Sequence, residues 1–371
     1  MSETQNYAPG QHPDLAPPVM AVGPVAWVRR NLFSNWINTA LTILSAALLF
    51  WMIPPLLSWF VLDAVFTGEN RQACAEASGA CWAVVTSRWE QLFYGLYPST
   101  ETWRINIAFV GLLLAVTPWL APQIAFRRQL VWFSLAYPFL AFWLLAGGVG
   151  LPTVHTGQWG GFTLTLVVGV TGIVASLPIG ILLALGRRSS LPVISMLCTG
   201  FIEIVRGVPL IMFLFMASNM LNLFLPQGVQ FDLLMRALIA VTLFSSAYMA
   251  EVVRGGLQAI PKGQFEAAQA MGLTYWQSMR FIILPQALRT VIPGIVNSFI
   301  ALFKDTSLVA IIGLFDLLNM AKAIVTDADW QGLSIEVYVF AGIVYWIVCF
   351  SMSRYSLWLE SSLSGGHKEA N

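Results

Sequence analysis

Two opposite charges, Lys304 and Asp305, lie inside a long apolar stretch and are the side chains best placed to do chemistry. An ionised side chain deep in a membrane span costs about 2.5–3.5 kcal/mol unless it faces a partner or a wet cavity. Asn297, Lys304 and Ser307 are spaced so that they share one polar face of a helix. Such a face suits a zwitterionic solute. A Lys304–Asp305 contact that only fixes helix packing is an equal alternative.

Two further sets of charges have helical spacing. Glu203 is followed by Arg206, and Glu251 by Arg254, so each pair lies on one helical face and can form an ion pair. Pairing lowers the cost of holding charge near lipid. A structural role is favoured over contact with a substrate. The sequence 207–209, Gly-Val-Pro, predicts a break or kink in the helix just after Arg206.

Patterns for catalysis are missing from the chain. No lysine is followed by Ser or Thr, so there is no phosphate loop of the G-x-x-x-x-G-K-[ST] type. No pair of histidines has metal-ligand spacing, and neither G-x-S-x-G nor H-E-x-x-H occurs. We therefore expect no catalytic residues, no bound metal and no cofactor of the chain's own.

The chain has four cysteines, too few for a disulfide framework. Cys198 and Cys349 lie in or beside apolar stretches and are interpreted as small apolar residues. Cys74 and Cys81 lie in a predicted external loop, where an oxidising compartment would permit a disulfide. A bridge between them and two free thiols are equal alternatives.

The composition indicates an all-α integral membrane protein, because 57% of the residues are hydrophobic and only 10% are charged. Stretches of about 20 apolar residues must be helical to pair their backbone groups inside a bilayer. There are about eight such stretches, at 36–60, 105–121, 130–149, 161–185, 201–223, 233–253, 291–313 and 335–358.

Basic residues set the expected orientation, because short loops rich in Lys and Arg remain cytoplasmic. In the eight-span arrangement these loops all fall on one side, whereas the loops 62–104 and 314–334 on the other side are poor in Lys and Arg. Both termini are therefore predicted to be cytoplasmic, as a tail of residues 1–35 and a tail of residues 360–371. The net charge of +1 gives no reason to expect a nucleic-acid partner.

One polar segment between two apolar stretches has a distinctive spacing. Its residues are Glu266, Ala267, Ala268, Gly272, Ile282, Leu284 and Pro285. This pattern of EAA, three residues, Gly, nine residues and I-x-L-P resembles the coupling loop of ABC-transporter permeases. The surrounding residues, about 161–359, resemble the polar amino-acid branch of those permeases, closest to the general L-amino-acid permeases.

The resemblance implies several roles. Residues 161–359 would be a five-helix type I ABC-importer core with a coupling loop at 255–289. The family's K-x-T-S-L element matches Lys304, Thr306 and Ser307, so that the candidate substrate pathway consists of Asn297, Lys304, Asp305, Thr306 and Ser307. Ala267 and Ala268 would form a knob for a groove on a partner, and Pro285 would end the loop before the next span.

Residues 36–150 carry no motif to which chemistry can be assigned and are interpreted as a structural extension of about three helices. The expected boundary is the Gly-rich sequence 147–152. The long extension resembles systems with two different permease chains.

The function implied by the resemblance is that of the permease subunit of an ATP-driven importer of polar L-amino acids in the bacterial inner membrane. Its partners would be a dimer of ABC ATP-binding subunits that use Mg-ATP, a second permease chain, a periplasmic amino-acid-binding protein and membrane lipid. The alternative is an ion-coupled secondary carrier that uses Lys304 and Asp305. The absence of internal repeats argues against that alternative.

Overall fold

The computed structural model describes residues 23–121, 123–124 and 126–364, which form two compact units. The first unit contains the described residues up to Val65 together with residues 76–81. It holds a short helix, α1 (Pro24–Asn31), and a long apolar helix, α2 (Trp36–Leu57). Asn35 starts α2 by accepting a hydrogen bond from the backbone N of Asn38 at 2.8 Å. A π-helical turn, Ser58–Leu62, continues the helix.

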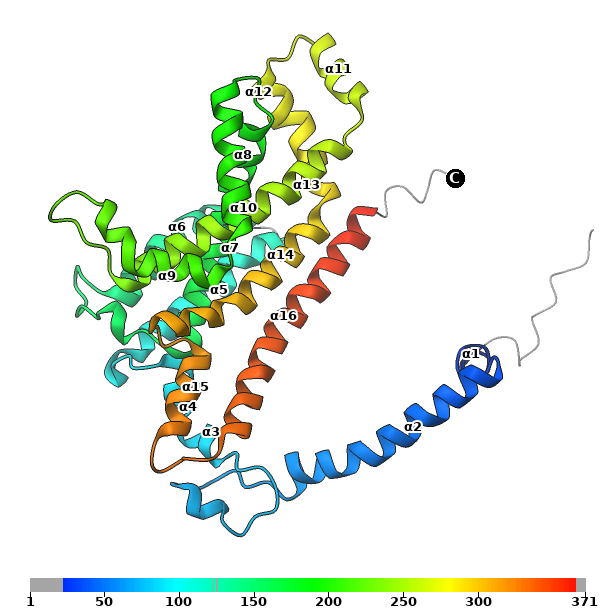
Figure 1. Cartoon of the computed structure of the whole chain (residues 1–371), viewed down its shortest axis with the longest axis vertical. Helices are drawn as coiled ribbons and strands as arrows, with labels where there is room; N and C mark the ends of the chain where they lie inside the picture. Colours follow the sequence, from blue (N-terminus) through cyan, green and yellow to red (C-terminus); the bar gives the residue numbers. More distant parts are fainter. Residues whose placement is uncertain (1–22, 122, 125, 365–371) are drawn as a thin grey trace, which may run out of the picture. The chain divides into compact units, whose positions relative to one another are not determined.

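The second unit, residues 66–75 and 82–364, is built from helices joined by short 3₁₀ turns (Figure 1). Its first helices are α3 (Ala83–Ser87), α4 (Trp89–Tyr94), α5 (Thr102–Leu120) and α6 (Arg127–Ala146). The next are α7 (Gly161–Arg187), α8 (Pro192–Gly207), α9 (Leu210–Met220), α10 (Leu233–Ala259), α11 (Lys262–Ala270) and α12 (Tyr275–Ser278). A π-helical turn (Met279–Ile283), α13 (Leu284–Thr290), α14 (Ile292–Asp305), a 3₁₀ segment (Thr306–Ile312), α15 (Leu317–Thr326) and α16 (Ser334–Ser364) complete it.

The all-α membrane architecture expected from composition is confirmed. Among the described residues, seven helical runs are long and apolar enough to cross a membrane, and one bent pair of helices adds an eighth. The seven are Trp36–Leu62, Ser99–Leu120, Arg127–Ala146, Gly161–Arg187, Leu233–Ala259, Ile292–Ile312 and Ser334–Ser362.

The bent pair corrects one expected span. Residues 201–223 do not form a straight helix, because α8 ends at Gly207, α9 begins at Leu210, and the two are bent by 107°. Pro209 has no backbone N–H to donate and disfavours helical geometry in the preceding residue. Val208 is accordingly extended, with φ −108° and ψ 135°. The break expected after Arg206 is therefore present, and the span starts earlier than predicted, at Pro192.

Helices α7 and α10 pack against each other at the centre of the second unit. Small residues on α7 permit the close approach: a Cβ atom added at Gly180 would lie 2.7 Å from the Cβ of Met249 on α10. Close packing of small residues is what holds helices together where lipid removes the hydrophobic drive. On the other side of this pair, α14 packs against α16 (Figure 1). Two of the helices that carry candidate charges, α10 and α14, thus pack against α7 and α16.

Residues 82–150 pack with the core, so the compact units do not divide at the expected boundary near 147–152. The short helix α4 lies against the start of α7, where Phe93 O accepts a hydrogen bond from Thr163 Oγ1 at 2.8 Å. The guanidinium of Arg104 is fully buried and donates to Pro152 O at 2.8 Å. These bonds attach α4 to the first turn of α7 and α5 to the segment that precedes α7.

Candidate functional site

The EAA pattern lies on a helical hairpin, α11 and α12, that directly follows α10 (Figure 1). The turn between the two helices uses Gly272 with φ +71°, a left-handed conformation that residues with a Cβ rarely adopt. Gly272 N donates to Gln269 O at 2.9 Å, and Leu273 N donates to Ala268 O at 3.2 Å. These bonds satisfy the last carbonyls of α11 and fix where the chain reverses.

Only part of the hairpin faces outward. Glu266 and Ala267 are exposed, whereas Ala268 is 1% exposed. Successive helix residues point about 100° apart, so Ala268 turns into the chain while Ala267 turns away from it. The expectation that both alanines would offer a knob to a partner is therefore corrected to Ala267. Two large apolar side chains, Met271 and Trp276, are exposed on the same hairpin.

The helical run that leaves the hairpin passes through Pro285, whereas the sequence predicted that Pro285 would end it. The π-helical turn before α13 allows this, because Leu284 N donates to Met279 O, five residues back. The wider turn accommodates a proline ring that would clash with a regular α-helical turn. Ile282 and Leu284 are half-buried and pack against the apolar cluster around Ile283 at the end of α10.

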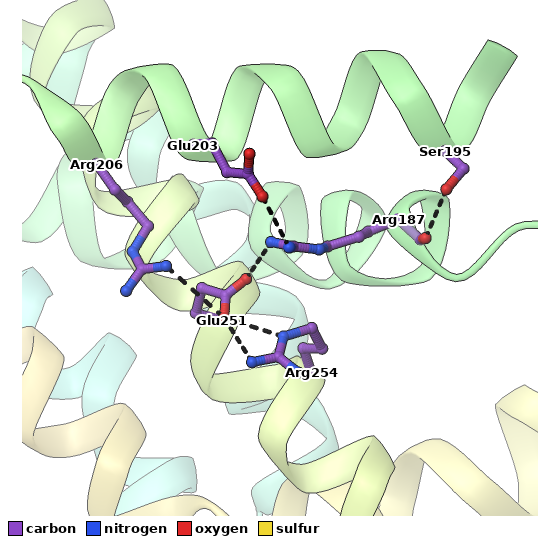
Figure 2. Close-up of polar contacts among 6 residues, drawn as sticks. All are labelled: Arg187, Ser195, Glu203, Arg206, Glu251 and Arg254. Carbon is purple, nitrogen blue, oxygen red and sulfur yellow. Dashed lines mark hydrogen bonds and ion pairs between the residues drawn. The ribbon is translucent and has the colours of Figure 1, made fainter. Parts of the chain in front are cut away.

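Glu251 and four other charged side chains, from three helices in all, form one cluster with Glu251 at its centre (Figure 2). Its Oε1 lies 2.6 Å from Arg187 Nη1, and its Oε2 lies 2.8 Å from Arg254 Nη2 and 3.7 Å from Arg206 Nη1. Arg187 Nη2 also reaches Glu203 Oε1 at 3.0 Å. We call these residues the arginine cluster. It joins the end of α7, the last two turns of α8 and the last third of α10.

The arginine cluster corrects one of the two expected pairs. The pair within α10, Glu251 and Arg254, is present, but Glu203 and Arg206 do not bind each other. Glu203 binds Arg187, and Arg206 points to Glu251 with its guanidinium carbon 5.4 Å from the centroid of the Tyr248 ring. Helical spacing permits a pair but does not require it when another helix supplies a competing arginine. Arg187 was not singled out from sequence, since basic residues occur at most span ends.

Helix α14 carries an exposed stripe of small and polar residues, Pro293, Asn297, Ala301 and Lys304, which we call the α14 stripe. Asn297 and Lys304 thus share a face, as predicted. No carboxylate of the described residues lies within 4.0 Å of the Lys304 ammonium, so the alternative Lys304–Asp305 ion pair is not formed. Asp305 is half-buried, outside the stripe.

Thr306 and Ser307 do not extend this stripe in the way the sequence predicted. Thr306 is fully buried, donates to Phe303 O at 2.7 Å, and lies 3.4 Å from the hydroxyl of Tyr345 on α16. It belongs to the interior of the chain. Ser307 is half-buried, and its hydroxyl donates to Lys304 O at 2.8 Å. The helical spacing used in the prediction does not hold beyond Asp305, because the α-helix changes to a 3₁₀ segment at Thr306.

A buried acid, Asp316, lies near Thr306, within the segment 314–334 that the sequence predicted to be an external loop. It is fully buried and starts α15 by accepting hydrogen bonds from Asn319 N at 3.0 Å and Leu318 N at 3.2 Å. Tyr345 donates to its Oδ2 at 3.3 Å. Burial raises the pKa of the Asp316 carboxyl to about 6, although these hydrogen bonds act in the opposite direction. An Asp just before an apolar helical segment was the signal for this cap.

The cysteines divide into two classes. Cys198 and Cys349 are free thiols. Cys74 and Cys81 are disulfide-bonded. The pairing of Cys74 with Cys81 stays a prediction.

The model of one protein family matches residues 176–365, a range that contains the α11–α12 hairpin, the whole arginine cluster and the α14 stripe. That family is described as the binding-protein-dependent transport system inner membrane component.

Individual relatives cover more of the chain. The inner membrane amino-acid ABC transporter permease protein YhdY of Escherichia coli is 52% identical over 92% of this chain and 94% of its own length. The glutamate/glutamine/aspartate/asparagine transport system permease protein BztC of Rhodobacter capsulatus is 43% identical over 95% of this chain and 98% of its own. A crystal structure of an amino acid ABC transporter with histidines is 30% identical over 54% of this chain and 90% of its own, with a TM-score of 0.48.

Proposed function

The chain belongs to the family of inner membrane components of binding-protein-dependent transport systems, and from this we propose that it is the permease subunit of an ATP-driven importer of polar L-amino acids. The observation that carries the proposal is the α11–α12 hairpin. It follows α10 without a long loop and presents Glu266, Ala267, Met271 and Trp276 outward. Exposed apolar side chains with a polar rim are typical of a protein interface.

The proposed cargo rests on the names of the relatives and on the α14 stripe. YhdY is named as an amino-acid permease, and BztC as a permease for glutamate, glutamine, aspartate and asparagine. The amide of Asn297 and the ammonium of Lys304 offer hydrogen-bond and charge partners to such solutes. These two residues are our candidates for lining the pathway.

The proposed assembly has four kinds of component besides lipid. They are this chain, a second and different permease chain, two ATP-binding subunits that hydrolyse Mg-ATP, and a periplasmic amino-acid-binding protein. The chain would lie in the bacterial inner membrane with both termini in the cytoplasm, so that the α11–α12 hairpin meets the ATP-binding subunits. Basic residues at the predicted cytoplasmic loops support this orientation.

Site-specific crosslinking tests the proposal. Cys198 and Cys349 are first replaced by Ala, and Ala267→Cys is introduced on the exposed face of α11. We expect this thiol to crosslink to a co-purified soluble ATPase in detergent-solubilised membranes, with a yield that changes on addition of Mg-ATP. The matched control is Ala268→Cys, one residue along, which is buried and should not crosslink.

The ion-coupled carrier predicts a different result. The chain would purify without an ATPase, and amino-acid uptake would continue in vesicles that have an ion gradient but no ATP. That outcome would contradict the proposed function.

A further inference from the structure

We infer that Arg187 is a positioning residue that makes α8 follow α10 when the α11–α12 hairpin moves. This inference rests on the proposed function, in which ATP-dependent movement of the hairpin drives transport. Arg187 would connect the hairpin to α8, a helix that is separated from the hairpin along the chain by α9 and α10.

The geometry of Arg187 is that of a bridge (Figure 2). One guanidinium carries both contacts: Nη1 lies 2.6 Å from Glu251 on α10, and Nη2 lies 3.0 Å from Glu203 on α8. Two charge-assisted hydrogen bonds from a single rigid planar group fix the separation of the two carboxylates. A change in the position of Glu251 is therefore transmitted to Glu203.

The backbone around Arg187 is fixed as well. The Arg187 carbonyl accepts a hydrogen bond from Ser195 Oγ at 2.9 Å, which ties the end of α7 to the first turn of α8 (Figure 2). The next residue, Arg188, places its guanidinium carbon 5.9 Å from the centroid of the Phe265 ring on α11. The end of α7 thus contacts both the hairpin and α8.

Glu251 is close enough to the hairpin to respond to it. It lies about two turns before the end of α10, and only Ile260 and Pro261 separate α10 from α11. A helix transmits displacement along its axis because its backbone hydrogen bonds are continuous. Movement of α11 therefore displaces Glu251.

Helix α8 is able to respond separately from α9. The two are bent by 107° at Val208 and Pro209, where no helical hydrogen bonds cross the break. A few residues between two rigid elements are the usual site of a hinge. A pull on Glu203 can turn α8 about this point while α9 keeps its place.

Removal of Arg187 should weaken the connection between α8 and α10 without unfolding the chain, because the ion pair that remains between them, Arg206 Nη1 to Glu251 Oε2, is 3.7 Å long and is not a hydrogen bond. Glu251 keeps Arg254, whose Nε and Nη2 donate to its Oε2 at 2.9 and 2.8 Å. The side chain of Glu203 is 61% exposed and can be solvated when it loses its partner. Arg187→Gln consequently leaves no buried charge unpaired.

The test uses the full complex with its ATPase and binding protein in nanodiscs, in a chain with Cys198 and Cys349 replaced by Ala. Spin-label pairs report two distances by pulsed electron paramagnetic resonance, with and without Mg-ATP. One pair joins Leu197→Cys on α8 to Ile347→Cys on α16, and the other joins Gln269→Cys on α11 to Ile347→Cys. All three positions are exposed.

We expect both distances to change with Mg-ATP when Arg187 is present. In Arg187→Gln the α11 distance should still change, while the α8 distance should not. Amino-acid uptake per ATP hydrolysed should fall by about tenfold or more, the factor that corresponds to loss of a hydrogen bond between charged groups. Glu203→Gln, which cuts only the α8 arm of the bridge, should reproduce this behaviour.

The control is Arg289→Gln, which removes an exposed arginine of α13 that forms no ion pair with any described residue; its α8 response should remain. An α8 response in Arg187→Gln equal to that of the unmodified chain would overturn the inference. The absence of any ATP response at α11 in the unmodified chain would instead overturn the proposed function.

Discussion

Two buried or half-buried acids in this chain, Glu251 and Asp316, are stabilised in different ways. Glu251 is surrounded by full positive charges from Arg187, Arg206 and Arg254. Asp316 forms no ion pair with any described residue and is instead stabilised by dipoles, namely two backbone N–H groups of α15 and the hydroxyl of Tyr345. Dipoles compensate a buried charge less completely than an ion pair does, which is why burial raises the pKa of Asp316.

The raised pKa makes the stability of the chain depend on pH. A carboxyl whose pKa rises from 3.8 to about 6 on folding binds its proton more tightly when folded. Its contribution to the free energy of unfolding is complete below pH 4 and is lost as the pH rises through 6, by at most about 3 kcal/mol. We expect the midpoint of thermal unfolding, followed by tryptophan fluorescence in detergent, to fall between pH 4.5 and 7.

Asp316→Asn tests the origin of this dependence. The amide can still cap α15 but does not titrate. The midpoint of thermal unfolding should therefore fall less between pH 4.5 and 7 than it does in the unmodified chain. Asp329→Asn is the control, because its side chain is 63% exposed and the dependence should be unchanged. Equal pH dependence in the unmodified chain and Asp316→Asn would contradict the assignment.

At the scale of elements, three prolines show that the same residue can end or continue a helix. Pro209 separates α8 from α9 because Val208 is extended. Pro285 stands inside a helical run, because a π-helical turn precedes it and Leu284 is helical, with φ −62° and ψ −42°. Pro55 likewise lies within α2 just before a π-helical turn. Two of these positions have a proposed role: the break at Pro209 is the proposed hinge, and the π-helical turn before Pro285 follows the proposed docking hairpin.

The turn of the α11–α12 hairpin supports a prediction at this scale. Gly272→Asp adds a charge to the docking face, and a charge that is desolvated on docking is costly. No atom lies within 4 Å of the added Cβ, so the fold should tolerate the change apart from about 1 kcal/mol of left-handed strain. We expect ATP-driven uptake to be abolished while the amount of protein in the membrane is unchanged, as measured by transport assay and immunoblot.

Gly272→Asn is matched in shape and in its tolerance of the left-handed conformation, but it carries no charge. It should keep most of the uptake. Normal uptake by Gly272→Asp would remove the coupling role from this hairpin.

At the scale of the whole molecule, the α14 stripe is a surface that one chain leaves open. Its residues Asn297 and Lys304 are exposed on a membrane-spanning helix, where contact with lipid would be unfavourable. Ala301 between them would permit close approach of another helix. A second permease chain and a polar pathway would together cover the stripe.

Lys304→Ala tests this interpretation. If the ammonium lines the pathway, uptake should fall by about tenfold or more, the effect of losing one hydrogen bond to a charged group. Co-purification of the ATPase should be unchanged, because the hairpin is untouched. Lys322→Ala is the control, since Lys322 is exposed on α15 and lies off the stripe. Unchanged uptake kinetics and substrate range in Lys304→Ala would exclude the pathway role.

The sequence by itself determined the features that depend on local chemistry. Apolar stretches long enough to span a bilayer must become helices, because lipid offers no partner to backbone groups. The break at Pro209, the left-handed turn at Gly272 and the shared face of Asn297 and Lys304 also follow from single residues or short spacings.

Only the tertiary structure decided which side chains meet. Glu203 lies three residues from Arg206 yet binds Arg187, sixteen residues away, because α8 folds back against α7. Thr306 is adjacent to the exposed end of α14 and is nevertheless buried against Tyr345 of α16. Helical periodicity defines the faces of a single helix. Which neighbour covers each face depends on how helices distant in the sequence pack together, and residue spacing within one helix does not specify that packing.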